Sequence, residues 1–195
     1  MTIDPTRAQF LSRGAKGGLA LVAGGSVLGL AVGQAGAQTP SDVEIAKLAA
    51  TAELLAIDFY TRALRSRKFA GDERRYLAEA RANERAHYAA LAKLLGPGAP
   101  KGVSFRYPRG AFGSRLAVAR LGVALETAFV GAYLGAVTAL SSNELKATAA
   151  TIAANESQHL SVLSEIAKDD PVGPAFPKAL TAAQATRAVT PFLAA

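Results

Sequence analysis

The sequence holds two histidines, and each follows a glutamate by three positions within the same local phrase. The first phrase is Ala-Asn-Glu-Arg-Ala-His, ending at His87, and the second is Ala-Asn-Glu-Ser-Gln-His, ending at His159. On an α-helix, residues three positions apart share a face, so each phrase directs one carboxylate and one imidazole toward the same point. Two such helices placed face to face would form a site for a pair of metal ions. This restricts the chain to folds in which helices meet side by side.

Other landmarks repeat with nearly the same spacing. The two Glu-x-x-His phrases are 72 positions apart, whereas Glu53 and Glu126 are 73 apart, as are Tyr60 and Tyr133. Each half therefore reads Glu, then Tyr seven residues later, then Glu-x-x-His. A lone Glu-x-x-His is common on helices, where such pairs also serve ordinary stability. The repetition of the whole set indicates one helical hairpin used twice, with the site where the two copies meet.

Helical periodicity and capping signals predict an all-α chain. Ser41-Asp42-Val43-Glu44 is a capping box that starts one helix, and Gly71-Asp72 marks a turn and the next N-cap. Residues 96–113 hold three prolines and five glycines, which predicts a long crossover rather than a tight hairpin. No stretch alternates as a strand would. We expect four long helices over about 41–67, 72–94, 115–140 and 143–169, and a short C-terminal helix over about 181–190.

Two of the glutamates sit within apolar sequence. Glu53 is followed by Leu54 and Leu55, and Glu126 lies among valine, alanine, leucine and phenylalanine. An unpaired carboxylate is costly to bury, but cations bound between such carboxylates remove that cost. Long helices, one central crossover and inward glutamates describe a four-helix bundle with a metal site. In the alternative, a bundle without metal, each glutamate pairs with an arginine or histidine, which leaves the repeat unexplained.

The chain has no cysteine, which excludes disulfides, thiolate metal sites and cysteine-ligated iron–sulfur centres. Half of the residues are hydrophobic and 19% are charged, enough for one domain with a sizeable core over residues 38–195. The formal net charge is +7, and basic residues gather around one predicted turn. We interpret them as solvated helix ends rather than a patch for anionic lipid or nucleic acid, because aromatic residues do not interleave regularly. No nucleic-acid partner is expected. The basic cluster consists of Arg62, Arg65, Arg67, Lys68, Arg74 and Arg75.

Residues 1–37 have the features of a cleaved export signal. An apolar stretch rich in glycine and alanine covers residues 17–33, and Ala35-Gly36-Ala37 fits a signal-peptidase site. The start resembles a twin-arginine signal, with Ala8 in place of the second arginine. We expect a periplasmic or extracellular protein; the alternative is a membrane anchor through residues 17–37, since the run is about long enough to span a bilayer. The positive n-region consists of Arg7, Arg13 and Lys16.

The motif set Glu, Glu-x-x-His, Glu, Glu-x-x-His resembles that of the ferritin-like di-iron carboxylate superfamily, over roughly residues 41–169. The chain is most similar to the exported bacterial ferritin-like domain proteins, and Ala52-Glu53 through Phe59-Tyr60 reads like their first helix. It departs from rubrerythrins in having no cysteine module. It also departs from bacterioferritins, because Met1 is the only methionine and the mature chain offers none as a haem ligand. A ferritin-like four-helix bundle is the fold that this resemblance implies.

The resemblance also implies a role for each ligand. Two glutamates would bridge two metal ions, two would bind one ion each, and each histidine would complete one ion's set. Four carboxylates and two imidazoles suit iron, with manganese as the alternative, whereas zinc usually takes fewer ligands. The implied bridging ligands are Glu84 and Glu156, the terminal carboxylates Glu53 and Glu126, and the imidazole ligands His87 and His159.

The implied function is an exported oxidoreductase that oxidises ferrous iron or reduces oxygen or peroxide in stress protection. Tyr60 and Tyr133 resemble tyrosines near such sites that can supply an electron; core packing with a hydrogen-bonded hydroxyl is the other interpretation. The alternatives are a structural or interaction protein, associated with the envelope or with desiccation, that binds metal without turnover, and a bundle that binds no metal. The electron donor is not indicated, and a homo-oligomer is left open.

Overall fold

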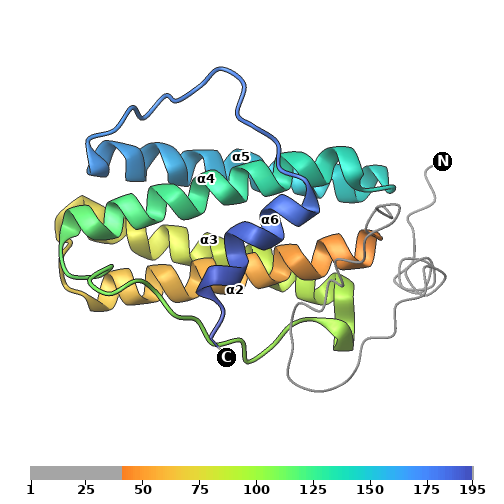
Figure 1. The fold of residues 1–195 in the computed structure, drawn as a ribbon, viewed down its shortest axis with the longest axis horizontal. Coiled ribbons are helices and arrows are strands. Elements are labelled where there is room, and N and C mark those ends of the chain that lie inside the picture. The colour runs from red at the N-terminus through yellow and green to blue at the C-terminus, as the bar shows by residue number, and fades with distance from the viewer. Residues whose placement is uncertain (1–40, 195) are drawn as a thin grey trace.

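The computed structural model describes residues 41–194, and within them the chain is helical (Figure 1). Four long helices, α2, α3, α4 and α5, form the body of the molecule, and the short helix α6 lies across it. The predicted export signal, residues 1–37, lies outside the described residues. The helices are α2 (Asp42–Arg65), α3 (Gly71–Leu95), α4 (Arg115–Ala139), α5 (Asn143–Ala167) and α6 (Ala182–Val189), with 3-10 turns at Gly96–Gly98 and Thr190–Phe192.

The long helices pack in two antiparallel pairs. α2 packs on α3, and α4 packs on α5. The segment between α3 and α4 runs along the bundle from one pair to the other, and no strand occurs among the described residues. The predicted all-α class, the four-helix bundle, the long crossover and the short C-terminal helix are therefore confirmed.

Local signals explain where most helices begin. The Ser41 hydroxyl accepts a hydrogen bond from the backbone N–H of Glu44, whose carboxylate accepts one from the N–H of Ser41, so the predicted capping box is present. At the starts of α4 and α5, the hydroxyls of Ser114 and Ser142 each accept a backbone N–H hydrogen bond, without the reciprocal glutamate contact. The predicted N-cap at Asp72 is wrong. α3 already begins at Gly71, whose φ of +50° suits glycine.

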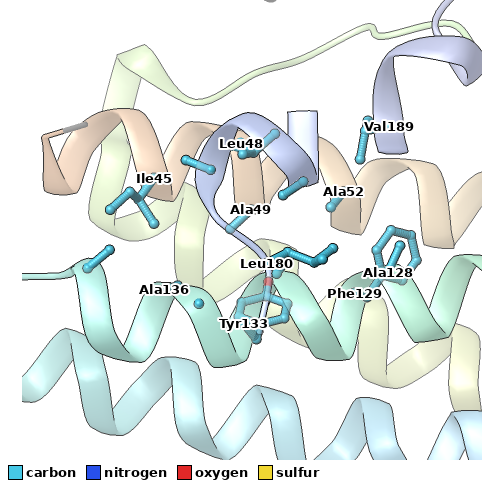
Figure 2. Close-up of a pocket in the computed structure, with 15 residues that line it drawn as sticks. Ile45, Leu48, Ala49, Ala52, Ala128, Phe129, Tyr133, Ala136, Leu180 and Val189 are labelled. Carbon is cyan, nitrogen blue, oxygen red and sulfur yellow. The ribbon is translucent and has the colours of Figure 1, made fainter. Parts of the chain in front are cut away.

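The segment before α6 comes very close to α4. The N–H of Leu180 donates to the carbonyl of Gly131 at 2.8 Å. A Cβ added at Gly135 would lie 1.8 Å from the carbonyl oxygen of Leu180, so only glycine allows this approach. Beneath α6 an apolar cavity of about 40 Å³ remains, lined in part by Leu48, Tyr133 and Leu180 (Figure 2). The C-terminal helix therefore covers the groove between α2 and α4.

α4 is the most apolar of the long helices. By length and composition alone it is the one helix of residues 41–194 that fits a membrane span. Its buried residues include Glu126, Phe129 and Tyr133, which face the other helices of the bundle. Of its most apolar stretch 39% is buried inside the bundle, so only part of its apolar character serves the core.

Candidate metal centre

Each of the four long helices contributes to one buried polar cluster inside the bundle. α2 and α4 each supply a glutamate and a tyrosine, and α3 and α5 each supply a Glu-x-x-His pair. The four carboxylates are at most 2% exposed. The structure thus brings together all six residues that the sequence predicts as metal ligands; their binding of metal stays a prediction. They are Glu53, Glu84, His87, Glu126, Glu156 and His159.

The six residues form two overlapping groups, and in each the potential ligand atoms lie within 4.8 Å of one another. One group adds Glu53 and His87 to a shared pair of glutamates, and the other adds Glu126 and His159 to the same pair. The shared pair consists of Glu84 and Glu156. The two groups are therefore adjacent and have two carboxylates in common.

The shared carboxylates reach both imidazoles. In Glu84, Oε2 lies 3.1 Å from Nδ1 of His87, and Oε1 lies 3.0 Å from Nδ1 of His159. In Glu156, Oε1 lies 3.2 Å from Nδ1 of His87, and Oε2 lies 3.0 Å from Nδ1 of His159. Each of these carboxylates therefore divides its two oxygens between the two halves of the site, as a bridging ligand would.

The other two glutamates each serve one half only. Glu53 Oε2 lies 3.5 Å from Nδ1 of His87, and Glu126 Oε1 lies 3.9 Å from Nδ1 of His159. The hydrogen-bond donor of each of these glutamates lies on the other helix pair. The hydroxyl of Tyr60 donates to Glu126 Oε1 at 2.5 Å, and the hydroxyl of Tyr133 donates to Glu53 Oε1. Each of the two tyrosines thus donates to the glutamate on the other of the helices α2 and α4, and not to the glutamate seven residues before it in the sequence.

Protein donors do not satisfy this cluster. Three buried carboxylate oxygens accept no hydrogen bond: Oε1 of Glu84, Oε2 of Glu126 and Oε1 of Glu156. The N–H at Nδ1 of each imidazole can donate in only one direction, yet three carboxylates lie within 4 Å of each Nδ1. Buried charges of one sign are stable only when they are paired or bind metal. The orphaned oxygens and this oxygen-rich donor set fit two divalent cations.

The pKa values of the cluster show how protons compensate its charge. Burial, together with the neighbouring carboxylates, raises the pKa of Glu53 and of Glu126 well above the usual value. Burial opposes the charged form of Glu84 too, but the two imidazoles close to it outweigh this effect and lower that pKa to about 2. Against the effect of burial, the surrounding carboxylates raise the pKa of His87 to about 12 and that of His159 to about 9. Without metal, these shifts favour the protonated forms of the imidazoles and of the outer carboxyl groups.

The two halves differ around their histidines, which the sequence did not indicate. Nε2 of His159 lies 3.2 Å from the side-chain nitrogen of Asn83, and its backbone carbonyl accepts a hydrogen bond from Tyr76 at 2.9 Å. No equivalent contact joins Asn155 to His87 among the described residues, although both asparagines stand in the same phrase. The His87 side chain is 14% exposed and that of His159 is 3% exposed. The half of the site at His87 is the one nearer to solvent.

Comparison with known families agrees with this geometry. A family model described as a ferritin-like domain matches residues 41–169, which include all four long helices. The chain belongs to the ferritin-like domain family, and the resemblance inferred from its motifs is confirmed at that level. A comparison with curated proteins returned no match.

Proposed function

We propose that this chain is an exported ferritin-like protein that holds a dinuclear iron or manganese site and oxidises ferrous iron or reduces oxygen or peroxide in stress protection. The observation that carries this proposal is the position of Glu84 and Glu156. Each is buried, each is shared by both ligand groups, and each presents one oxygen to each imidazole. A cluster that served packing alone would have no need of this arrangement.

The donor set favours iron or manganese. Carboxylate oxygens and imidazole nitrogens are hard to borderline ligands, and six of them exceed what a tetrahedral zinc site takes. Glu53 and His87 would complete one ion's ligands, and Glu126 and His159 the other's. When bound, a pair of iron ions supplies the exchange of two electrons with a small oxidant.

Tyr60 and Tyr133 are suited to hold protons next to this site. Burial raises the pKa of both hydroxyls well above 10, so both remain neutral phenols at ordinary pH. Each hydroxyl already contacts a carboxylate oxygen. If Tyr60 gives up one electron, its proton can pass to Glu126 Oε1 along the existing hydrogen bond. This supports an electron-donor role in addition to packing.

The experiment is oxidation of ferrous iron by the loaded protein. Metal-free protein is loaded anaerobically with ferrous iron, exposed to oxygen or peroxide, and the remaining ferrous iron is measured over time. We expect consumption faster than that of free ferrous iron in the same buffer. Glu84→Ala should abolish the acceleration, while Glu79→Ala, at an exposed position on the same helix, should retain it.

Two results would overturn this proposal in favour of one of the alternatives. If two ions bind per chain but oxidation is no faster than in buffer, the chain is a metal-binding structural protein without turnover. If the purified protein binds no iron or manganese, the bundle is metal-free. Export is tested separately, by the mass of the protein secreted from a bacterial host: cleavage after Ala37 supports it, and an intact chain in the membrane fraction supports the anchor.

A further inference from the structure

The core of the bundle is divided at the end where α2 and α5 begin and α3 and α4 end. One cluster of buried residues there includes Ile45, Tyr133 and Ile152, and a separate cluster includes Ala46 and Leu91. Between the two lies a pocket of about 450 Å³, whose lining includes members of both. Protein interiors are otherwise close-packed, with few voids larger than a water molecule. An opening of this size is within the range of small-molecule sites, about 300–1,000 Å³.

The lining of this pocket changes character with depth. Its inner wall is apolar and buried, as at Ile45, Tyr133 and Ile152. Its rim carries both signs of charge together with hydroxyl groups. An apolar interior with a few polar groups is the usual composition of a ligand site. The polar and charged residues of the rim are Asp42, Lys93, Ser142, Glu144 and Thr148.

The volume of the pocket limits the occupant to a small molecule. An α-helix with its side chains is roughly 10–12 Å across, so about one helical turn would fill a space of this volume. The helix of a partner protein would therefore gain little contact here, whereas an extended small molecule reaches the buried wall. The rim carries two carboxylates and one ammonium group, close to balance, so it offers no strong preference for a charged head group. Asp42 already accepts two hydrogen bonds from Ser141, at 2.9 and 3.0 Å.

We infer that this pocket binds a small, uncharged apolar molecule with one polar end, of the class of a medium-chain alcohol. Its apolar part lies against Ile45, Leu91 and Ile152, and its polar end lies at the rim. The ring of Tyr133 forms part of the wall, while its hydroxyl donates to Glu53 of the metal cluster. The occupant therefore lies one side chain away from that cluster. The inference does not depend on bound metal or on turnover.

The test uses the full chain and N-phenyl-1-naphthylamine, an uncharged apolar fluorophore. We expect saturable binding, with displacement by 1-decanol. Ala90→Trp places a large ring at an exposed position of the pocket wall and should weaken binding about tenfold or more, equivalent to about 1.4 kcal/mol. Ala89→Trp, at the exposed neighbouring position outside the lining, should leave binding unchanged.

A second pair of variants keeps the inference testable if Ala90→Trp fails to fold. Thr148→Trp is at the rim and should also weaken binding, whereas Thr151→Trp, one turn along α5 and outside the lining, should not. Unchanged binding in both Ala90→Trp and Thr148→Trp, or no saturable binding by the wild type, overturns the inference. Decanoate and decylamine test the polar end: stronger displacement by either than by 1-decanol overturns the assignment of an uncharged ligand.

Discussion

The hydroxyl of Tyr133 on α4 donates its hydrogen bond to the carboxylate of Glu53 on α2. Tyr60 on α2 makes the reciprocal contact with Glu126 on α4. These two contacts join the halves of the repeat crosswise beside the candidate metal centre. Neither glutamate has its tyrosine donor on its own helix, so the outer carboxylates are positioned only when both helix pairs are in place.

Removing one of these donors should destabilise the metal-free protein. Tyr133→Phe leaves a buried carboxyl oxygen of Glu53 without its donor, and a buried acceptor left unsatisfied costs about 1–3 kcal/mol. We expect the free energy of unfolding in urea to fall by about that amount. Tyr88→Phe is the control: its hydroxyl donates to the neutral carbonyl of Pro100 at 2.7 Å, and its loss should cost only about 1 kcal/mol. Equal losses in the two variants would contradict a special role for the Tyr133 contact.

The shared carboxylates should be required by both ions. Because Glu84 and Glu156 each face both imidazoles, Glu84→Ala or Glu156→Ala should remove both metal ions. His87→Ala should weaken mainly one of them. Metal content per chain, measured by mass spectrometry after dialysis, checks this, with Glu79→Ala as the surface control. Two ions retained by Glu84→Ala would rule out the bridging assignment.

The hydroxyl of Tyr60 should affect oxidation and not metal content. Tyr60→Phe removes only the hydroxyl that contacts Glu126, so we expect slower reoxidation of the iron-loaded protein, or altered products, at an unchanged iron content. Stopped-flow oxidation with a parallel iron assay measures both quantities. An oxidation rate and product pattern identical to those of the wild type would leave Tyr60 with a packing role.

The stability of the metal-free protein should fall as pH rises from about 6.5 to 9. The folded pKa of His159 is raised to about 9 and that of His87 to about 12, so their contribution is complete below the unfolded value of 6.5 and is lost as pH rises through the folded values. The raised pKa values of Glu53 and Glu126 act in the same direction. Metal binding displaces these protons, so affinity should rise with pH. The check is the melting temperature measured against pH, once with a chelator and once with added manganese. We expect the difference between the two melting temperatures to grow as pH rises over this range. A constant difference would contradict the protonation of the metal-free cluster.

The close approach of Leu180 to α4 should make Gly135 sensitive to substitution. Gly135→Ala would place a methyl group 1.8 Å from the carbonyl oxygen of Leu180, and the backbone must move. We expect a loss of about 1–3 kcal/mol in the free energy of unfolding and faster hydrogen exchange in α6. Gly98→Ala is the matched control, because its methyl group would meet only the Lys47 side chain, at 3.7 Å.

The four helices could be predicted because their signals are local. Capping residues such as Ser41 and Ser142 are close in sequence to the N–H groups they satisfy. The start of α3 differs from the prediction because its N-cap is Ala70, which has no side chain able to accept a hydrogen bond and so gives no capping signal in the sequence. The bounds of the remaining helices agree with expectation to within a few residues.

The contacts that were not predicted connect residues far apart in sequence. The repeat placed Tyr60 and Tyr133 near the site, but the identity of their acceptors depends on how the two helix pairs pack. The contact between Asn83 and His159 breaks the apparent symmetry, and identical local phrases do not reveal it. The contact of Leu180 with Gly131 depends likewise on the path of the C-terminal segment.

The packing of the bundle in pairs has a mechanical consequence. The charged cluster lies at the boundary between the α2–α3 pair and the α4–α5 pair, and its ligands come from both sides of that boundary. Cations shared by Glu84 and Glu156 would therefore hold one helical hairpin to the other, while each hairpin keeps its own internal contacts. Demetallation should weaken the bundle along this one plane, so that the two hairpins separate before either of them unravels.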